Sequence, residues 1–600
     1  MDIALEESNG VRLAIEGCGH GTLHAIYASV EEACKQKGWP GVDLLIIGGD
    51  FQSVRNAFDL NCVSMPPKYR SMCDFHEYYS GQRTAPYLTV FVGGNHEASN
   101  YLLELYFGGW VAPNIYYMGV ANVLKLGPLR IAGLSGIWKG FDYRKTHFER
   151  LPYNESDMKS IYHVRELDVR KLLQIRTQVD VGISHDWPQS VEWKGNWKQL
   201  FNFKKYFEED ARSGKLGSIA AKQVLDRLRP RYWFSAHLHC KYAAKVSHEQ
   251  QAVLQQPLPG HEASSKHALN GIGEHSNGVA KPSKNADEID LDLDEDDSPA
   301  EASLGLHTTP ATAVSTAPKN TDEIDLELDD DDAGADQPSA PSTESAKATA
   351  TIVLNNPTSP NGDALSLEAA RAALPASFAK PKDPERMEHP PDIANKETSF
   401  LALDKCLPNR NFLQLLSVPT TDANTTTNVD LARPLKLEYD REWLAIARAF
   451  AFIERPAFGD PDARVPPAKT QAEYRDLIAE HRAWIDSHIS ESDLVIPPNF
   501  EVIAPVYDGG HFQDAKYQQV QEYPNPQTQR FCELLQIDNP LEISEEERAE
   551  RMAAGPRPEQ EFKRFGGGRG RGGFDRGRGR GGRGGRGRGG GRGRGRVSGG

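Results

Sequence analysis

Long hydrophobic runs are missing from this 600-residue sequence. The longest apolar runs, Leu44–Ile47 and Tyr87–Val92, fall far short of the roughly 20 residues that a membrane-spanning helix needs. The opening stretch MDIALEESNG has neither the basic nor the apolar region of a signal peptide. We therefore expect no contact with a membrane and no secretion.

Cysteine is also scarce, because the chain has only seven, widely spaced and odd in number. Secreted proteins that depend on disulfides carry a denser, even-numbered set. This pattern excludes a disulfide framework and favours a reducing compartment.

Aromatic residues nearly vanish between positions 248 and 395, where Phe378 is the only one. Ser, Ala, Pro, Asp and Asn dominate there, so the segment cannot bury enough apolar surface to offset its chain entropy. We predict a disordered acidic linker over 248–395. An acidic-hydrophobic motif occurs in it twice, starting at Asp287 and Asp322. It is either a solvating stretch or a docking motif for a partner protein.

Acidic residues almost disappear at the end of the chain. From Phe565 to Gly600 there are 11 Arg, 20 Gly and a single Asp, a net charge of +10 within a chain whose total is −15. We predict a disordered Arg-Gly tail over 546–600. Its guanidinium groups suit RNA phosphates and bases, or alternatively the acidic linker of the same chain.

The remaining segments are expected to fold. In 1–247, short apolar runs alternate with potentially helical stretches, a pattern typical of an α/β domain. The runs are Arg12–Ile15, Asp43–Ile47, Leu88–Val92, Leu129–Ile131, Asp180–Ile183 and Tyr232–Phe234, and the helical stretches include Thr22–Lys37 and Ser218–Leu228. Segment 396–545 has helix-period apolar positions in Phe400–Leu416, Leu435–Phe452 and Thr470–Ile485, which predicts a smaller, mostly helical domain.

Potential metal ligands follow five of these apolar runs. They are Cys18 with His20, Asp50, Asn95 beside His96, His185, and His237 with His239. Ligands of α/β proteins bind beyond the carboxyl ends of the strands, so we expect these side chains to meet there. Each alone has a simpler explanation, such as a buried thiol, a tight Gly-Gly turn or a structural histidine. Their conjunction predicts a two-metal hydrolytic site in which a carboxylate bridges two cations.

The order Cys-x-His, Gly-Asp, Gly-Asn-His-Glu, His, His-x-His resembles the calcineurin-like metallophosphoesterase superfamily. A Cys at the first position, where the superfamily usually has Asp, resembles the RNA lariat debranching enzymes. Further similar stretches are Glu16–Gly21, Ser135–Gly140, Ser184–Pro188, Tyr232–His239, Phe400–Pro408 and Tyr523–Gln527. The resemblance implies a metallophosphoesterase β-sandwich flanked by helices, followed by the C-terminal domain of that family.

It also implies hydrolysis of the 2′,5′-phosphodiester at the branch point of excised intron lariats, as part of mRNA processing. By position, one metal would be held by Cys18, His20, Asp50 and His239. The other would be held by Asp50, Asn95, His185 and His237. His96 would be the general acid that protonates the departing 2′-oxygen.

The resemblance makes segment 135–165 the lariat recognition loop. It is rich in basic and aromatic residues, which suit phosphates and unstacked bases, although the aromatics could instead pack on the domain. The candidate RNA contacts are Trp138, Lys139, Tyr143, Arg144, Lys145, Tyr153 and Tyr162.

The thiolate of Cys18 favours Zn²⁺ or Fe²⁺, and Mn²⁺ fits the site that lacks Cys. We expect two such divalent ions, branched intron RNA as substrate, a nuclear location, and spliceosome-associated proteins as partners of the acidic linker. Two alternatives stay open: a metallophosphoesterase for other phosphodiesters or phosphoproteins, and an RNA-binding scaffold with an inactive phosphoesterase fold.

Overall fold

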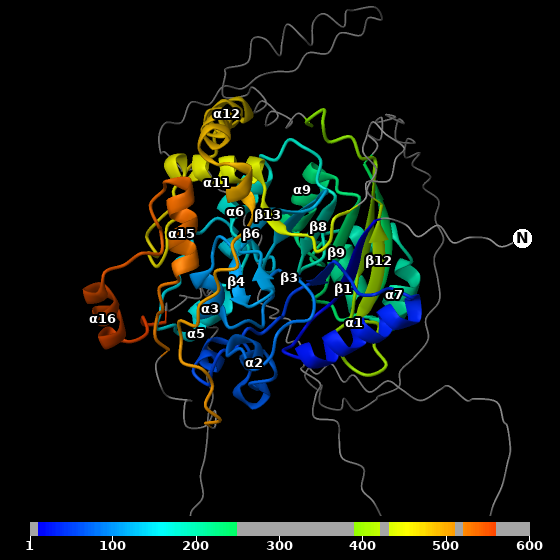
Figure 1. Ribbon diagram of the computed structural model, residues 1–600, viewed down its shortest axis with the longest axis horizontal. Coiled ribbons are helices and arrows are strands. Elements are labelled where there is room, and N and C mark those ends of the chain that lie inside the picture. Colours follow the sequence, from blue (N-terminus) through cyan, green and yellow to red (C-terminus); the bar gives the residue numbers. More distant parts are fainter. Residues whose placement is uncertain (1–9, 249–388, 420–430, 511–519, 560–600) are drawn as a thin grey trace, which may run out of the picture. The chain divides into compact units, whose positions relative to one another are not determined.

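Two β-sheets form the centre of the protein in a computed structural model, which describes residues 10–248, 389–419, 431–510 and 520–559 (Figure 1). One sheet has the strand order β12-β1-β2-β3-β5-β4 and the other β10-β11-β9-β8-β7-β6-β13. The strands of the first sheet, in that order, are Leu413–Val418, Val11–Glu16, Leu44–Ile47, Thr89–Phe91, Ile115–Tyr117 and Gly109–Ala112. Those of the second are Tyr242–Ser247, Glu397–Ala402, Tyr232–Ser235, Val181–Ser184, Leu129–Leu134, Ala121–Leu126 and Leu437–Tyr439.

The inner faces of the two sheets pack against each other. Leu13 and Ile15 of β1 lie in one buried cluster with Ile183 of β8 and Phe234 of β9. Ala14, between them in sequence, belongs to a different cluster on the outer side. This alternation follows from the period of two residues along a strand. The predicted β-sandwich is confirmed.

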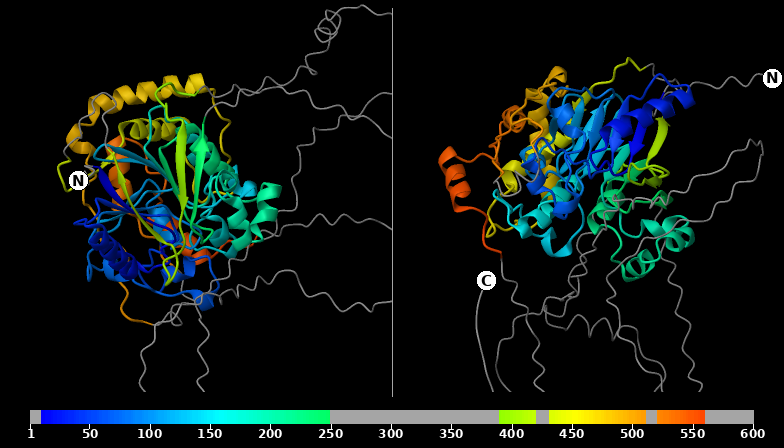
Figure 2. Two further views of the ribbon diagram at one scale, coloured as in Figure 1. Left: turned by 90° about the vertical axis from the view of Figure 1, so that its right-hand side faces the viewer. Right: turned by 90° about the horizontal axis from the view of Figure 1, so that it is seen from below.

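Helices cover both outer faces (Figures 1 and 2). Helix α1 (Leu23–Lys37) packs on the six-stranded sheet, and α6 (Glu166–Leu172), α9 (Ile219–Leu228) and α11 (Arg441–Ile453) pack on the other. The other helices are α2 Phe75–Tyr79, α3 Ser99–Glu104, α4 Gly140–Tyr143, α5 Glu155–Ser160, α7 Trp197–Phe203, α8 Phe207–Ser213, α12 Gln471–His488, α13 Glu491–Leu494, α15 Pro526–Leu535 and α16 Glu545–Ala554. Short 3-10 turns lie at Asp59–Cys62, Pro67–Tyr69 and Val191–Lys194.

The C-terminal segment completes both sheets of the sandwich. Strand β11 lies between β9 and β10, β12 pairs along the whole of β1, and β13 pairs with β6. The described residues up to Arg557 consequently form one compact unit. Phe400–Leu416, which helix periodicity assigned to a helix, contains the end of β11 and the start of β12. Strand pairing with distant partners outweighs the local preference of so short a segment.

Helices predicted further along are confirmed. Leu435–Phe452 contains β13 and then α11, whose first turn is capped by the side chain of Asp440. Thr470–Ile485 contains most of α12, which begins with a capping box between Thr470 and Glu473.

The boundaries of the two segments predicted to be disordered need correction. Helix α16 starts at Glu545 and continues into the predicted tail as far as Ala554. A helix is stable there because Ser544 caps its first turn and three glutamates in that turn interact favourably with the helix dipole. Residues 389–395, predicted as linker, are anchored by the buried Ile393 and by Asn395, whose amide donates to backbone oxygens beside β9. The rest of the linker, including both acidic motifs, and the Arg-Gly tail from 560 lie outside the described residues.

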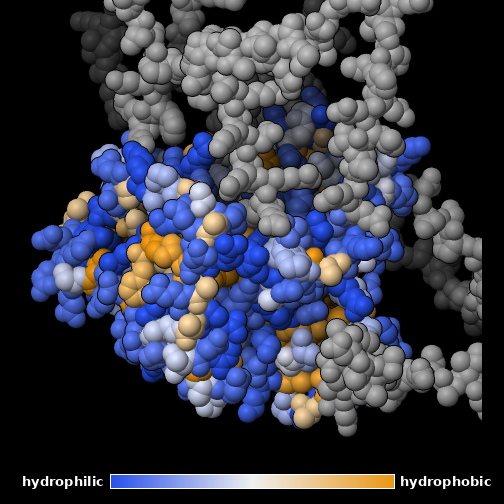
Figure 3. Space-filling model, turned by 90° about the horizontal axis from the view of Figure 1, so that it is seen from above, coloured by the Kyte–Doolittle hydropathy of each residue, from blue (hydrophilic) through white to orange (hydrophobic). Residues whose placement is uncertain are grey.

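All seven cysteines are free thiols, as predicted. Across the described ranges, no helix combines the length and apolarity needed to cross a membrane. On the coloured part of the face shown in Figure 3, hydrophobic residues form small separate areas within a mostly hydrophilic surface.

Candidate metal centre

The carboxyl ends of strands from both sheets converge on one site. Cys18 and His20 follow β1, Asp50 follows β2, and Asn95 follows β3 of the six-stranded sheet. His185 follows β8, and His237 and His239 follow β9 of the other sheet. All seven predicted ligands therefore lie just beyond strand ends, where the sequence placed them.

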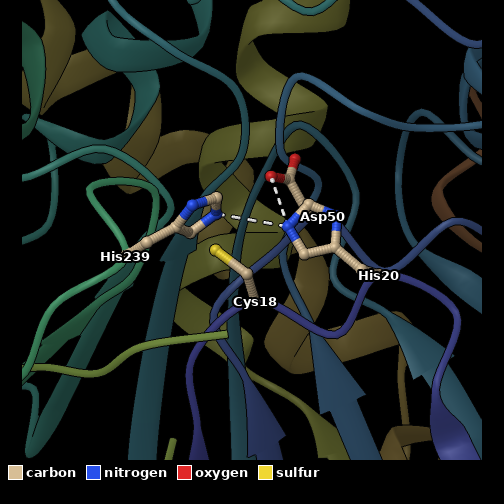
Figure 4. A group of neighbouring side chains, drawn as sticks. All are labelled: Cys18, His20, Asp50 and His239. Carbon is tan, nitrogen blue, oxygen red and sulfur yellow. Dashed lines mark hydrogen bonds and ion pairs between the residues drawn. The ribbon is translucent and has the colours of Figure 1, made fainter. Parts of the chain in front are cut away.

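Four of these side chains form a compact cluster. The ligand atoms of Cys18, His20, Asp50 and His239 all lie within 4.8 Å of one another. His20 Nε2 lies 3.2 Å from His239 Nε2 and 3.7 Å from Asp50 Oδ2. Figure 4 shows the four side chains pointing toward one another. This is the first of the two ligand sets expected from the sequence.

The second set lies on the other side of Asp50. His185 Nε2 is 3.4 Å from Asp50 Oδ1 and 3.2 Å from Asn95 Oδ1. The His237 ring lies 4.9 Å from the His185 ring, and its backbone N–H donates to Cys18 Sγ at 3.2 Å. Asp50 therefore directs one carboxylate oxygen at each set, as a bridging ligand does.

The chemistry of these donors fits divalent cations. Burial lowers the pKa of His20 to about 4 and that of His237 to about 3, so both imidazoles are neutral and have a free lone pair. Burial and then the Asp50 charge raise the pKa of Cys18, so a thiolate there needs a cation beside it. Among the described residues, no hydrogen-bond partner reaches Asp50 Oδ2 or His237 Nδ1, although both atoms are buried. A bound cation would satisfy these atoms.

The backbone at the site is strained. His20, Asp50, His237 and His239 have φ values between 40° and 63°, a left-handed region that non-glycine residues rarely adopt. A Cβ on Gly94 would lie 2.2 Å from Asp50 Oδ1, so only glycine lets the two loops approach this closely. Strain of this kind is concentrated at functional sites, where the surrounding fold holds it in place.

A set of buried hydrogen bonds orients the ligands. The Glu97 carboxylate accepts from the backbone N–H groups of Phe51, Gln52 and Gly94 at 2.8–2.9 Å. It thereby joins the loops after β2 and β3. His185 Nδ1 donates to the Gly48 carbonyl at 2.9 Å, which turns Nε2 toward Asp50. Glu97 was part of the motif recognised in the sequence, but the sequence assigned it no role.

His96 lies beside the ligands rather than among them. Its backbone N–H donates to Asp50 Oδ1 at 2.9 Å. Its ring Nδ1 donates to the Ser64 carbonyl at 3.0 Å, and Nε2 lies 3.2 Å from the Asn95 amide nitrogen. The ring is therefore held in one orientation, next to both Asn95 and the cluster.

The predicted recognition loop borders this centre. Trp138 N–H donates to the Asp186 carboxylate at 3.2 Å, next to His185. The charge of Lys139 acts on His237, where it adds to the lowering of the pKa by burial and by His185. Salt bridges of Asp142 with His163 and of Arg165 with Glu149 hold the loop together from inside.

The seven predicted RNA contacts of this loop differ in exposure. Arg144 and Lys145 are exposed. Trp138 and Tyr143 are half-buried and pack against each other with ring centroids 4.8 Å apart. Tyr153 has a buried hydroxyl, and the Tyr162 hydroxyl bonds to Ser64. Lys139 is half-buried beside the cluster. Packing within the fold thus accounts for part of the aromatic content.

The C-terminal segment contributes to the centre in a way that sequence reasoning missed. The Asp404 carbonyl accepts from Cys18 N–H, and Cys406 N–H donates to the Cys18 carbonyl, both at 3.3 Å. The charge of the intervening Lys405 acts on both His20 and His239. No spacing rule could connect these residues to Cys18, because the whole linker separates them in sequence.

Comparison with known proteins agrees with this architecture. Residues 11–241 match the calcineurin-like phosphoesterase family, and residues 395–540 match the C-terminal domain of lariat debranching enzyme. The chain is 34% identical over 527 residues to the lariat debranching enzyme of Schizosaccharomyces pombe, which covers 88% of this chain and 96% of that protein. The corresponding protein of Drosophila melanogaster is 35% identical over 544 residues, 88% of this chain and 78% of its own.

The lariat debranching enzyme of Homo sapiens is 54% identical over 240 residues, 40% of this chain and 44% of that protein. The identity is thus higher over a stretch about as long as the first folded segment, and that segment carries all seven predicted metal ligands. The chain belongs to the lariat debranching enzyme family of calcineurin-like phosphoesterases.

Proposed function

We propose that this protein hydrolyses the 2′,5′-phosphodiester at the branch point of lariat RNA. The observation that carries the proposal is the arrangement around Asp50, whose two carboxylate oxygens face separate groups of buried, neutral nitrogen donors. Such an arrangement suits a phosphoryl group held between two cations. Family membership supplies the substrate class.

The calcineurin-like fold implies divalent metal ions. We propose that Cys18, His20, Asp50 and His239 hold one and that Asp50, Asn95, His185 and His237 hold the other. When bound, such ions supply Lewis-acid stabilisation of the phosphoryl oxygens. The thiolate of Cys18 favours Zn²⁺ or Fe²⁺ in the first set, and Mn²⁺ fits the second.

We assign the general acid to His96. The Ser64 carbonyl only accepts, so Nδ1 carries the hydrogen of that bond and Nε2 is the ring atom left to face the reacting groups. Nε2 lies on the side of Asn95 and the cluster. As general acid, Nε2 would exchange this contact, in which it accepts from the Asn95 amide N–H, for the departing 2′-oxygen and donate its proton there, because that oxygen is a poor leaving group without one.

The exposed basic groups of the recognition loop are proposed to hold the RNA. Arg144 is exposed, and Lys145 is exposed although its ammonium also pairs with Asp142 at 2.6 Å. Arg144 would contact phosphates beside the branch point, and Lys139 and Lys145 would add positive charge to the same surface. Trp138 and Tyr143 would offer the edges of half-buried rings to unstacked bases.

The proposal is tested with the purified full chain and a synthetic branched RNA, compared with a linear RNA of the same sequence. We expect metal-dependent cleavage of the branched molecule alone, and none by Asp50→Ala. Equal cleavage of the two RNAs would instead favour a general phosphodiesterase. Tight binding of branched RNA with no cleavage under any divalent metal would favour a scaffold.

We also propose a nuclear location and docking of spliceosome-associated proteins on the acidic linker, since the substrate is a product of splicing. The linker lies outside the described residues. Imaging of the tagged chain, with and without residues 249–388, tests both proposals. We expect a nuclear signal from both proteins. Association with splicing factors should be lost in the protein that lacks 249–388.

A further inference from the structure

A second aromatic and basic segment lies outside the predicted recognition loop. Residues 193–207, which include helix α7 and the start of α8, contain six aromatic residues, four lysines and no acid. Its sequence alone points to no particular role. In the structure it divides into an inner, packed part and an outer, exposed part.

The inner part is a platform that packs on the core. Trp193, Trp197 and Phe201 contact one another with ring centroids 5.3–6.1 Å apart. Phe201 is buried in the cluster under the seven-stranded sheet, and the two tryptophans pack against it. These rings hold α7 in place, so their aromatic character is explained by the fold.

The outer part is not explained by the fold. Phe203 is 53% exposed and Tyr206 61% exposed, two of the most exposed large hydrophobic side chains in the part of the chain that the structure describes. At these exposed positions the two rings do not contribute to the hydrophobic core, so packing does not explain why they are aromatic. Exposed aromatic rings are what the bases of single-stranded nucleic acid stack on.

The charged residues that precede and separate these two rings are all lysines. Lys204 Nζ lies 5.5 Å from the Phe203 ring centre and 6.0 Å from that of Phe207, and Lys198 and Lys205 are exposed. Acidic residues follow in the first turn of α8, where Glu208, Glu209 and Asp210 lie, and Glu208 pairs with Arg212 at 2.6 Å. The lysine-rich side of the patch, which includes Phe203, therefore complements a chain of phosphates.

The patch adjoins the metal centre. Gly195, in the same segment, forms an isolated β-bridge with Ala244 of β10. The Tyr242 hydroxyl, also on β10, donates to the Glu192 carbonyl just before the segment. Because β10 begins three residues after the ligand His239, the α7–α8 segment packs beside the strand that leaves the metal centre.

We propose that Phe203 and Tyr206, with Lys198, Lys204 and Lys205, form a binding track for one single-stranded arm of the branched RNA. A branch-point nucleotide carries three RNA strands, so a site that holds it needs an exit path for each. The recognition loop borders the centre at Asp186, and the α7–α8 track would take a second arm past Cys240. This inference rests on the proposed function and adds a further RNA contact to it.

The test uses two branched RNAs, one with arms of ten nucleotides and one trimmed to a single nucleotide on each arm. For the double variant Phe203→Ala/Tyr206→Ala, we expect KM and Kd for the long-armed RNA to rise by about tenfold or more, the usual effect of losing a stacking contact. The trimmed RNA should be cleaved as by the unaltered chain. Phe452→Ala, which removes a ring 59% exposed on α11, is the matched control and should change neither.

Unchanged affinity of the double variant for long-armed RNA would overturn the track, and so would an equal loss on both substrates, which indicates damage to the fold or centre. Affinity is measured separately from cleavage, with Asp50→Ala as the background. Failure of the unaltered chain to cleave branched RNA would count against the proposed function, while the binding comparison would still decide on the track.

Discussion

Among the single residues of the centre, His96 depends most on its exact orientation, because one particular ring nitrogen must deliver the proton. Ser64, which lies in the loop after the turn at Asp59–Cys62, fixes which atom that is by accepting from Nδ1. The side chain is 7% exposed, so it is sheltered but not closed off from an RNA placed on the centre.

Replacement of His96 by Ala should lower kcat by roughly 10²–10⁴, the usual contribution of general acid catalysis. Both metals and the affinity for branched RNA should remain, since His96 belongs to neither ligand set. Asp50→Ala is the contrasting variant and should lose metal. With a nitrophenyl ester as leaving group the loss for His96→Ala should shrink, because a nitrophenolate needs no proton. An equal loss with both leaving groups would make His96 a residue that only orients the phosphate.

The residues of this centre differ in how far the sequence could predict them. Asp50, His185 and His237 could be predicted, because each directly follows a buried strand and has a side chain that binds metals. The roles of Ser64 and Lys405 could not, since they act through a backbone carbonyl and through a contact across the linker. Ligands that follow strands can therefore be predicted from the sequence, whereas the groups that orient them cannot.

At the scale of elements, the join between the two folded segments is a pair of neighbouring strands. β10 ends at Ser247 and β11 begins at Glu397, and these two residues face each other in an antiparallel pair. The His248 N–H donates to the Lys396 carbonyl at 2.8 Å, which extends the pair by one bond. The linker therefore leaves and re-enters the fold at one place.

Replacing 249–388 with a short Gly-Ser connection should leave the fold and the chemical step intact. A shorter loop costs less entropy to close, by about 0.6 kcal/mol for each halving of its length, so stability should stay equal or rise. Thermal unfolding and single-turnover cleavage check this. A chain ending at residue 248 is the contrasting case and should not unfold cooperatively, because β11 and β12 are then missing from both sheets. Cooperative unfolding of that fragment would contradict the shared architecture.

The strands also differ in how far the sequence could predict them. The buried strands β1, β2, β8 and β9 could be predicted from short apolar runs, because both of their faces are covered. Strand β11 alternates instead, with Thr398, Phe400 and Ala402 buried and their neighbours more exposed. Its position between two strands of the first segment depends on tertiary pairing, which local sequence does not encode.

The recognition loop depends on an internal charge whose protonation can be followed. Burial raises the pKa of Asp142, but hydrogen bonds from His163 and Lys145 outweigh it and lower the pKa to about 2. A folded-state pKa below the unfolded value of about 3.9 means that this stabilisation is present above pH 4 and is lost as the pH falls toward 2.

Asp142→Asn should therefore reduce the free energy of unfolding at pH 7 by about 1.5–3 kcal/mol, the usual range for hydrogen bonds to a charged group. The difference between variant and unaltered chain should persist at pH 5 and shrink between pH 4 and pH 2. Denaturant unfolding across this pH range measures it. A difference that stays constant with pH would show that the carboxylate charge plays no part.

At the scale of the whole molecule, charge is strongly divided along the chain. The last 36 residues carry a net +10, and the remainder carries −25. The tail from 560 lies outside the described residues, and the compact unit ends at residue 557. Binding of RNA by the folded unit and by the tail should therefore be separable.

Deleting 560–600 should leave unfolding and the single-turnover rate unchanged, while RNA affinity falls and its dependence on salt becomes flatter. Each phosphate contact that is lost lowers the slope of log K against log salt by about 0.7 for single strands. Titrations between low and moderate salt measure this slope. An unchanged slope would mean that the tail does not touch RNA and would favour its contact with the acidic linker.

The proposed reaction cuts one particular bond, and a branch-point nucleotide presents two, because its ribose carries a 2′,5′ and a 3′,5′ linkage. Mass analysis of the products from one branched RNA, with metal-free protein and after return of a divalent ion, shows which linkage is cut. We expect cleavage of the 2′,5′ linkage alone, giving a 5′-phosphate and a free 2′-hydroxyl, only when metal is present. Cleavage of the 3′,5′ linkage at a similar rate, or full activity of the metal-free protein, would contradict this proposal.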